Sequence, residues 1–391
     1  MFGLLLLAYA VNAMDRMVFP VLLVEVRAEY RFGIEAAGLQ ATVFALGMGL
    51  AGLPAGRIQR LFGRKCTIVF GTLVFSAATV LTTVSVGFAD MLVWRVLSGV
   101  GEALQLAAII TVASSTFSAR RGVAVGSINM AFAAGSVIGP AVGSGLLESY
   151  GTWRAPMLAF GTFGIVLSLA IVVFVSPRLT EADATAGFTS HVGGAGSLLS
   201  RNPLTLAVIT ALFGLVDFSF IGLYATYLRE ELHYGSGTAG LVVGLSGLAA
   251  FASPFGGHLV DRMSPRVLIP VLNLGVAACG CALFLVPGTT AWQAVFSFLF
   301  GLAASSGVYV AAVGYLVKSV DEKGVGRVAG LFVTCVYVAA SVAGLLFSSL
   351  VAAAGWTAAA MVQIVGLSVL GAVLGLCLRP ELFSKIDNTK D

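Results

Sequence analysis

Long apolar runs dominate this sequence of 391 residues and constrain its fold more than any other feature. Most of them approach the roughly 20 residues that a helix needs to cross a bilayer. Hydrophobic residues make up 58% of the chain and charged residues only 10%, whereas a water-soluble domain carries about 25% charged residues. The sequence therefore predicts an integral membrane protein, and it excludes a large soluble catalytic domain, a secreted disulfide scaffold and a nucleic-acid-binding module.

Short polar or Gly/Pro-containing segments divide the apolar runs into twelve expected membrane spans. The spans are 2–23, 37–56, 66–87, 90–114, 122–147, 153–175, 203–228, 238–257, 265–287, 290–317, 326–351 and 355–378. Together with short connections they account for the whole chain. The expected fold is thus an all-α membrane protein of twelve transmembrane helices.

The basic residues predict how the chain is oriented in the membrane. Of the 22 lysines and arginines, 16 fall on the side of the N-terminus, and only Arg27, Arg31, Arg154 and Arg229 fall on the other side. Short loops rich in Lys and Arg stay in the cytoplasm. Both termini are therefore expected to be cytoplasmic, in a multi-pass protein of the plasma membrane, which in a bacterium is the inner membrane.

A polar stretch near the midpoint predicts two halves of six helices each. This stretch is the longest between spans and is rich in Gly, Ser, Thr and Ala, as a flexible linker is. The expected organisation is an N-terminal half 1–176, a cytoplasmic linker 177–202, a C-terminal half 203–378 and a cytoplasmic tail 379–391.

An internal repeat supports this division. The segment from Gly56 to Lys65 follows the second span, and a similar segment from Gly257 to Arg266 follows the eighth, at an offset of 201 residues. The segments Gly151-Thr-Trp153 and Gly355-Trp356-Thr357 precede the sixth and twelfth spans at nearly the same offset. Two parallel six-helix repeats are typical of a transporter with its site at the repeat interface.

Three motifs resemble those of the major facilitator superfamily. The segment Gly56-Arg-Ile-Gln-Arg60-Leu-Phe-Gly63-Arg64-Lys65 is similar to the loop motif G-x-x-x-D-x-x-G-R-K of that family. Arg95 to Gly101 resembles the R-x-x-x-G-x-G motif, and Gly135 to Gly143 resembles the G-x-x-x-G-P-x-x-G motif. The resemblance implies that conformational gating involves Gly56, Arg60, Gly63, Arg64, Lys65, Asp261, Arg262, Gly135, Gly139 and Pro140.

Two shorter strings resemble narrower groups within that superfamily. Asn12-Ala-Met-Asp15-Arg16 and Gly101-Glu102-Ala103 are similar to strings of the spinster-like lipid transporters and of the organic-anion:proton symporters. This resemblance implies an organic anion or an amphipathic lipid, such as a lysophospholipid, as substrate. The motif around Pro140 is similar to that of exporters and antiporters, which implies export in exchange for protons, although a packing kink is the structural alternative.

The first loop motif departs from the family pattern at one position. Arg60 stands where the family has an acidic residue, whereas the second copy keeps the acid as Asp261. In the family that acid lies near a helix N-terminus and pairs with basic residues, which holds the cytoplasmic side closed. The departure predicts a weakened outward-facing preference, with Asp261 carrying the remaining contact.

Five ionisable residues lie well inside expected spans: Asp15, Arg16, Arg95, Glu102 and Asp217. A charge at the bilayer centre costs roughly 2.5–3.5 kcal/mol on insertion scales, so these residues are expected to face a partner or a cavity. Neighbouring side chains diverge by about 100° on a helix, so Asp15 and Arg16 are expected to meet different partners. Arg95 and Glu102 are two turns apart and share one helix face.

The roles expected of these residues follow from their chemistry. Asp15, Glu102 and Asp217 are candidates for proton coupling, with a polar contact to the substrate as the alternative for Asp217. Arg16 and Arg95 are candidates for substrate binding, because a guanidinium can hold a carboxylate or phosphate bidentately. The structural alternative for Asp15 and Arg16 is an interhelical ion pair that serves packing, and for Arg95 it is a contact to the backbone or to a loop.

Uncharged polar residues inside the spans supply further candidates for substrate binding, although such residues often only join helices. The candidates are Gln105, Asn129, Tyr224, Tyr309 and Tyr337. The five cysteines lie in apolar runs, and the three histidines lack partners at metal-ligand spacing, so neither a metal site nor a cofactor is expected.

These observations predict a proton-coupled secondary transporter that works by alternating access, with export favoured. No G-x-x-x-x-G-K-[ST] segment occurs, so ATP is not expected to drive it. The alternatives are a multidrug:proton antiporter and a non-transporting membrane receptor with the same fold, and a membrane-embedded enzyme is not expected. The expected partners are a small-molecule or lipid substrate, protons and membrane lipids, with no nucleic acid, and the expected oligomeric state is a monomer.

Overall fold

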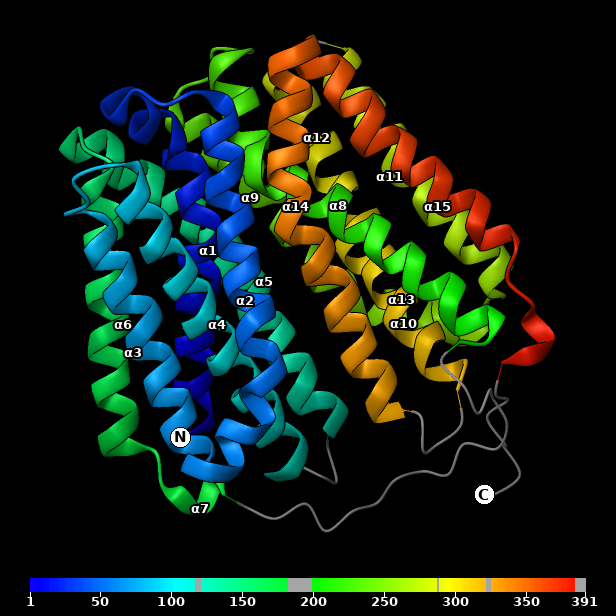
Figure 1. The fold of residues 1–391 in the computed structure, drawn as a ribbon, viewed down its shortest axis with the longest axis horizontal. Coiled ribbons are helices and arrows are strands. Elements are labelled where there is room, and N and C mark those ends of the chain that lie inside the picture. The colour runs from blue at the N-terminus through cyan, green and yellow to red at the C-terminus, as the bar shows by residue number, and fades with distance from the viewer. Residues whose placement is uncertain (117–120, 182–198, 287, 321–324, 384–391) are drawn as a thin grey trace.

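The computed structural model describes residues 1–116, 121–181, 199–286, 288–320 and 325–383 (Figure 1). The first half of the chain contains α1 Phe2–Tyr30, α2 Ile34–Phe62, α3 Arg64–Thr82, α4 Phe88–Thr116, α5 Arg121–Tyr150, α6 Arg154–Phe174 and the short α7 Pro177–Thr180. The second half contains α8 Arg201–Glu230, α9 Ser236–Leu248, η2 Ala249–Ala252, α10 Ser253–Arg262, α11 Pro265–Leu285, α12 Thr290–Gly301, η3 Leu302–Val308, α13 Tyr309–Lys318, α14 Val325–Ala359, η5 Ala360–Gly366, α15 Leu367–Leu376 and η6 Pro380–Leu382.

The chain makes twelve crossings, as the sequence predicts. Among the described residues, eleven helical runs are long and apolar enough to span a membrane, and the last of them, Leu331–Leu376, contains two crossings. The helix is broken there at Gly355, whose backbone has φ 81° and ψ 170°, a conformation that glycine adopts because it has no Cβ. Gly151, its counterpart before the sixth span, also has a positive φ, of 65°.

Three of the twelve crossings are interrupted helices, which the apolar pattern does not reveal. The eighth crossing passes from α9 through the 3₁₀ turn η2 into α10. The tenth and twelfth crossings contain the π-helical segments η3 and η5. Such π-helical turns are frequent at functional sites, and η3 lies beside the cavity described below.

The first span extends further than its apolar run predicts. The run ends near residue 23, but α1 continues to Tyr30 and carries Glu25, Arg27 and Glu29 on its last turns. Each of these charges has an ion-pair partner on another helix. The helix therefore continues because tertiary contacts satisfy the charged turns that hydropathy alone marks as a loop.

The helices form two bundles that lie side by side (Figure 1). In the first bundle α3 and α6 lie on the outer flank, and in the second bundle α11 and α15 occupy the equivalent place. The outward faces of α3 and α6 expose large apolar side chains such as Phe70 and Val173, as lipid-facing helices do. Residues 182–198 of the predicted linker and 384–391 of the predicted tail lie outside the described residues.

Small residues bring helices into close contact, both between the two bundles and within the first bundle. A Cβ at Gly38 in α2 would collide with the carbonyl oxygen of Gly344 in α14, and a Cβ at Gly139 in α5 would lie 2.7 Å from the Met14 Cα in α1. Backbones can approach this closely only where the side chain is absent. The glycines in the fifth-span motif therefore fix the packing of α5 against α1.

The two bundles are joined at one end, which we call the closed end, where α1 and α8 terminate. One apolar cluster there combines residues of both bundles, including Leu22, Trp153, Leu223 and Phe347. Two other clusters, around Ile109 and around Leu316, each lie within a single bundle. The bundles diverge towards the opposite end, which we call the open end, where α1 begins (Figure 1).

Candidate functional site

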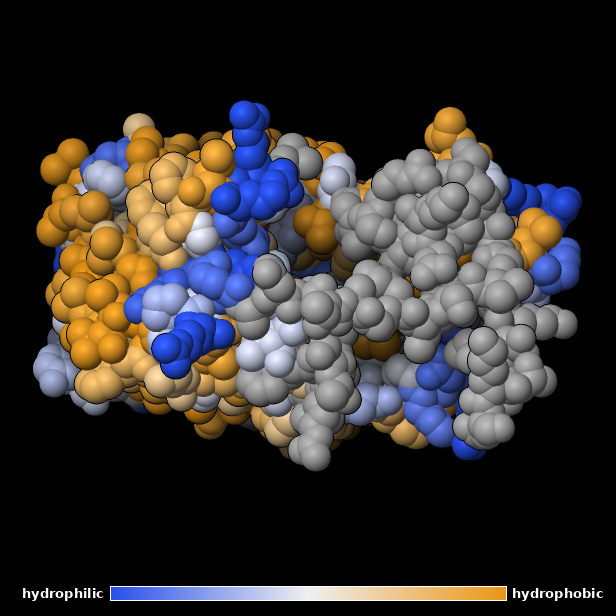
Figure 2. Space-filling view, turned by 90° about the horizontal axis from the view of Figure 1, so that it is seen from below, coloured by the Kyte–Doolittle hydropathy of each residue, from blue (hydrophilic) through white to orange (hydrophobic). Residues whose placement is uncertain are grey.

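A central cavity of about 210 Å³ lies between the two bundles. Seen from the open end, the surface has a hollow between the bundles (Figure 2). Helices α1, α2, α4 and α5 form one wall, and α8, α9, η2, α10, α12, η3, α13 and α14 form the other. Most of its lining is apolar and much of it aromatic, with phenylalanines at positions 19, 44, 132, 213, 218, 220 and 300. The cavity therefore suits a ligand with a large apolar part.

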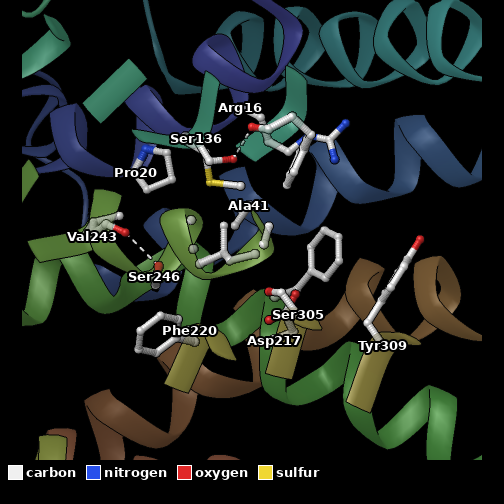
Figure 3. Close-up of a pocket in the computed structure, with 18 of the residues that line it drawn as sticks. Arg16, Pro20, Ala41, Ser136, Asp217, Phe220, Val243, Ser246, Ser305 and Tyr309 are labelled. Atoms are coloured by element: carbon white, nitrogen blue, oxygen red, sulfur yellow. Dashed lines mark hydrogen bonds between the residues drawn. The ribbon is translucent and has the colours of Figure 1, made fainter. Parts of the chain in front are cut away.

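An ion pair between Arg16 and Glu102 lies on the first-bundle side of the cavity. The Arg16 Nε and Nη2 atoms lie 3.0 and 2.9 Å from the Glu102 Oε2 atom, and both residues are buried. Arg16 lines the cavity directly (Figure 3), whereas Glu102 lies behind it. The second carboxylate oxygen, Oε1, has no hydrogen-bond partner among the described residues. Glu102 therefore retains an acceptor atom for a proton or a water molecule.

A chain of hydrogen bonds continues from this pair into the first bundle. Arg16 Nη2 donates to Asn12 Oδ1, and Asn12 Nδ2 donates to Gln105 Oε1 at 2.9 Å. Gln105 Nε2 in turn donates to Thr72 Oγ1 at 2.8 Å. Gln105 is fully buried and is not among the residues that line the cavity. Its position supports the packing alternative, in which it orients the Arg16 pair without touching a ligand.

Asp15 and Arg95 form a second buried polar group. Asp15 accepts hydrogen bonds from Thr79 Oγ1 at 2.8 Å and Ser98 Oγ at 3.1 Å. The Arg95 guanidinium lies 4.1 and 4.7 Å from the centroids of the Phe19 and Phe44 rings, an arrangement that stabilises a cation. Asp15 thus meets different partners from Arg16, as the helical geometry predicts.

Arg95 and Glu102 share one helix face but have separate contacts. Glu102 pairs with Arg16 across the α1–α4 interface, and the Arg95 Nε atom has no hydrogen-bond partner among the described residues. Arg95 lines the cavity, and Asp15 is buried behind it. Arg95 and Glu102, which share one face of the fourth span, therefore belong to two separate polar sites.

Asp217 lies on the opposite wall, in the middle of α8. Its side chain is partly exposed and lines the cavity together with Ser305 and Tyr309 (Figure 3). It has neither a hydrogen bond nor an ion pair with any described residue. Asp217 is thus a cavity carboxylate whose charge is offset by no side chain in the described part of the chain.

The other predicted binding residues separate into two groups. Asn129, Tyr309 and Tyr337 line the cavity. Tyr224 is buried and donates to Gln293 Oε1 at 2.9 Å in the closed-end cluster, away from the cavity. Nothing in a single sequence distinguishes a tyrosine that faces a cavity from one that faces a neighbouring helix.

The predicted gating residues of the first loop motif make contacts within their own bundle. Gly56 and Arg60 lie on the last turns of α2, and Gly63, with φ 84°, separates α2 from α3. The backbone N–H groups of Arg64 and Lys65 donate to the Glu181 carboxylate at 3.1 and 2.9 Å. Glu181 thus supplies a negative charge at the N-terminus of α3, where it is favourable.

The second loop copy is also paired within one bundle. Asp261 in α10 lies 2.7 Å from the Lys318 Nζ atom in α13, and Arg262 is the exposed last residue of α10. Both members of this ion pair belong to the second bundle, so the Asp261–Lys318 pair does not join the two bundles in this conformation. Pro140 lies inside α5 at the contact with α9, where its carbonyl oxygen approaches Gly240.

The closed end carries charged residues that hydropathy reasoning did not select. Arg229 of α8 binds both carboxylate oxygens of Glu25 in α1, with one Nη1–Oε2 distance of 2.5 Å, and Arg27 of α1 pairs with Glu230 of α8. The sequence feature that could have indicated these pairs is the presence of both acidic and basic residues at the ends of the first and seventh spans. These residues form what we call the closed-end ion pairs.

A further contact across the bundles caps a helix at the same end. Glu148 of α5 accepts hydrogen bonds from the Gly237 N–H at 2.7 Å and from Ser236 Oγ at 3.0 Å. Both donors lie in the first turn of α9. A carboxylate is favourable at a helix N-terminus, so this contact also stabilises the closed end.

The described residues contain no group of three or more His, Cys, Asp or Glu side chains placed to hold a metal ion. The charged groups of the site are instead arranged as the Arg16–Glu102 ion pair, the carboxylate of Asp15 held by two hydroxyl groups, Arg95 on aromatic rings, and Asp217 with no partner among the described residues. Such an arrangement offers both positive and negative groups to a charged ligand.

Curated relatives match parts of the chain at low identity. Multidrug resistance protein MdtL of Klebsiella pneumoniae is 26% identical over 255 residues, which cover 64% of this chain and 64% of the relative. The probable anion transporter 6 of Arabidopsis thaliana is 27% identical over 41% of this chain and 31% of the relative, and the probable L-galactonate transporter of Escherichia coli is 25% identical over 54% and 46%.

Solved structures show the same fold over nearly the whole chain. A bacterial homologue of the human lysosomal transporter Spinster, in an inward-facing and occupied conformation, has a TM-score of 0.77 at 18% identity and covers 96% of this chain and 95% of its own. A D-xylose-proton symporter has a TM-score of 0.77 at 16% identity, with coverages of 97% and 98%.

The family model of the Major Facilitator Superfamily matches residues 5–344 and 206–390, which together extend over almost the whole chain. The twelve crossings, the paired bundles and the central cavity agree with that match. The chain therefore belongs to the major facilitator superfamily of membrane transporters.

Proposed function

We propose that this protein is a proton-coupled secondary transporter that moves an amphipathic organic compound through the central cavity by alternating access. The observation that carries the proposal is the Arg16–Glu102 pair beside an aromatic cavity that lies between two bundles joined at one end only. Rocking of the bundles about this cavity would expose it to each side of the membrane in turn.

The proposed coupling follows from the charge balance of the Arg16–Glu102 pair. With Glu102 ionised, its carboxylate occupies the Arg16 guanidinium. A proton on Glu102 removes the negative charge and leaves Arg16 available for an anionic group of the substrate, such as a carboxylate or a phosphate. Binding of the proton and binding of the substrate are then coupled, because protonation of Glu102 frees Arg16 and an anion on Arg16 replaces the Glu102 carboxylate as its partner. Asp15, held beside Arg95, is the second candidate proton site.

The positive-inside bias supports the proposed orientation. With both termini in the cytoplasm, the open end of the cavity faces the cytoplasm and the closed-end ion pairs lie on the outer side. A bacterial inner membrane is the proposed location. The Pro140 motif favours export in exchange for protons, whereas joint binding of a proton and an anion at the Arg16–Glu102 pair gives symport, which an inward proton gradient drives as uptake. The low-identity match to a multidrug resistance protein supports a second candidate, a hydrophobic-compound:proton antiporter, because the cavity is largely aromatic.

The test is ligand-driven proton movement in proteoliposomes loaded with a pH-sensitive dye. Three probes are added in parallel: galactonate, lysophosphatidylglycerol and ethidium. We expect at least one probe to move protons with the wild type, and Glu102→Gln to abolish that movement while the purified variant still binds the probe. Proton movement of wild-type size in Glu102→Gln would exclude Glu102 from coupling. Binding without flux in the wild type would favour the receptor alternative.

A further inference from the structure

The charges around the cavity differ between its two walls. On the first-bundle wall both arginines have stabilising contacts: Arg16 pairs with Glu102, and Arg95 lies on the Phe19 and Phe44 rings. On the second-bundle wall Asp217 faces the cavity with no hydrogen bond or ion pair to any described residue. An ionised group at this depth is costly unless a partner offsets its charge, so the structure leaves a place for a positive group here.

The surroundings of Asp217 suit an organic cation. Phe213 lies one turn before Asp217 on the same face of α8, and its ring lies 6.1 Å from that of Tyr309. Phe218 and Tyr337 form a second ring pair with centroids 5.9 Å apart. All four rings line the cavity. Aromatic faces attract ammonium groups, and they also provide the apolar surface that the rest of such a ligand needs.

Polar contacts near the carboxylate can orient the ligand. The Ser305 side chain lies on the π-helical segment η3, on the same wall as Asp217 (Figure 3). Tyr309 follows at the start of α13 and is 43% exposed, which places much of its surface in the cavity. A π-helical turn displaces the side chains that follow it relative to a regular helix, and here Ser305 within η3 and Tyr309 directly after it both line the cavity.

From this arrangement we infer that Asp217 binds a cationic group, such as an ammonium, on an amphipathic substrate whose apolar part lies against the cavity rings. This inference rests on the proposed transport function, because it assigns a substrate class to the same cavity. It also gives Asp217 a role in recognition in place of the proton coupling expected from the sequence. A substrate with an additional anionic group would reach Arg16 on the facing wall.

The test compares two small ligands of similar shape and opposite charge. Benzyltrimethylammonium and phenylmethanesulfonate each carry a benzyl group on a tetrahedral charged centre. Binding to the purified full-length protein is measured by isothermal titration calorimetry for the wild type, Asp217→Asn and Asp217→Glu. Glu381→Gln is the matched control, because it removes an acidic residue that lies in the second half of the chain but outside the cavity.

We expect the wild type and Glu381→Gln to bind the ammonium ligand more tightly than the sulfonate. Asp217→Asn should lower the ammonium affinity at least tenfold, about 1.4 kcal/mol, and leave the sulfonate affinity unchanged or higher, whereas Asp217→Glu should keep most of the ammonium affinity. The inference is overturned if the wild type does not bind the ammonium, if Asp217→Asn binds it as the wild type does, or if Asp217→Asn loses both ligands equally.

A flux measurement separates this inference from the proposed function. Uptake of radiolabelled benzyltrimethylammonium into proteoliposomes is followed under an imposed proton gradient. Asp217-dependent binding without any uptake would leave the cation site in place and contradict transport of a cationic substrate through this cavity. Proton-driven uptake that is the same in Asp217→Asn would support transport and contradict the cation site.

Discussion

The closed-end ion pairs provide the sharpest test of how this protein changes conformation. Glu25–Arg229 and Arg27–Glu230 are the two pairs, and both join α1 of the first bundle to α8 of the second. The arginine side chains are only 14% and 17% exposed, and the glutamates 26% and 33%. Because alternating access requires these helices to separate at this end, the pairs should stabilise the present state over the oppositely facing one.

The perturbation is the double substitution Glu25→Gln with Glu230→Gln. A solvent-exposed pair contributes about 0.2–1 kcal/mol, and these partly buried pairs, one of them bidentate, should each contribute about 1–1.5 kcal/mol. Removing both should therefore shift the equilibrium by about 2–3 kcal/mol, which is roughly a 30- to 150-fold change in the population ratio. High salt should reduce the effect, since the pairs are not fully buried.

The assay measures the distance between the two bundles at the closed end by double electron–electron resonance. Spin labels are attached at Gly33→Cys and Gly235→Cys, where an added Cβ meets no atom within 4 Å. The exposed Cys66 and Cys377 are first replaced by serine. We expect the double variant to gain a population at longer distance that is small or absent in the parent protein.

Glu29→Gln is the matched control for the double variant. Glu29 pairs with Arg154 at the same end, with two contacts of 2.5 and 2.7 Å, but both residues belong to the first bundle. This substitution should not change the distance distribution. A shift of equal size in Glu29→Gln, or no shift in a folded Glu25→Gln/Glu230→Gln protein, would refute the assignment of the closed-end pairs as a conformational lock.

Two further predictions concern the backbone at a helix break and at a helix N-terminus. Gly355→Ala should lower the free energy of unfolding by about 1–3 kcal/mol, because φ 81° with ψ 170° is a conformation that only glycine adopts readily. The control is Gly257→Ala, at a helical position with open space around it. This control should be neutral or slightly stabilising in the same unfolding measurement. Glu181→Gln should speed amide hydrogen exchange at Arg64 and Lys65, because their backbone N–H groups donate to the Glu181 carboxylate. Unchanged exchange would show that the negative charge of Glu181 does not stabilise the first turn of α3.

Much of the fold follows from the sequence because hydropathy and spacing are properties of single helices. The twelve crossings and the positions of most helices follow from the apolar runs and the breaks between them. The turns at Gly151 and Gly355 follow from repeated glycines, and both adopt positive φ. The short list of in-span charges also follows, since an ionisable residue inside an apolar run is visible without a structure.

Only the tertiary structure decided which of these residues act together. Arg95 and Glu102 share a helix face, yet Glu102 binds Arg16 because the rotation and tilt of α1 and α4 bring those two together. Tyr309 faces the cavity while Tyr224 packs at the closed end for the same reason. The closed-end ion pairs join residues more than 200 positions apart. Helical periodicity fixes the direction of a side chain relative to its own helix, whereas its partner depends on how the helices are packed.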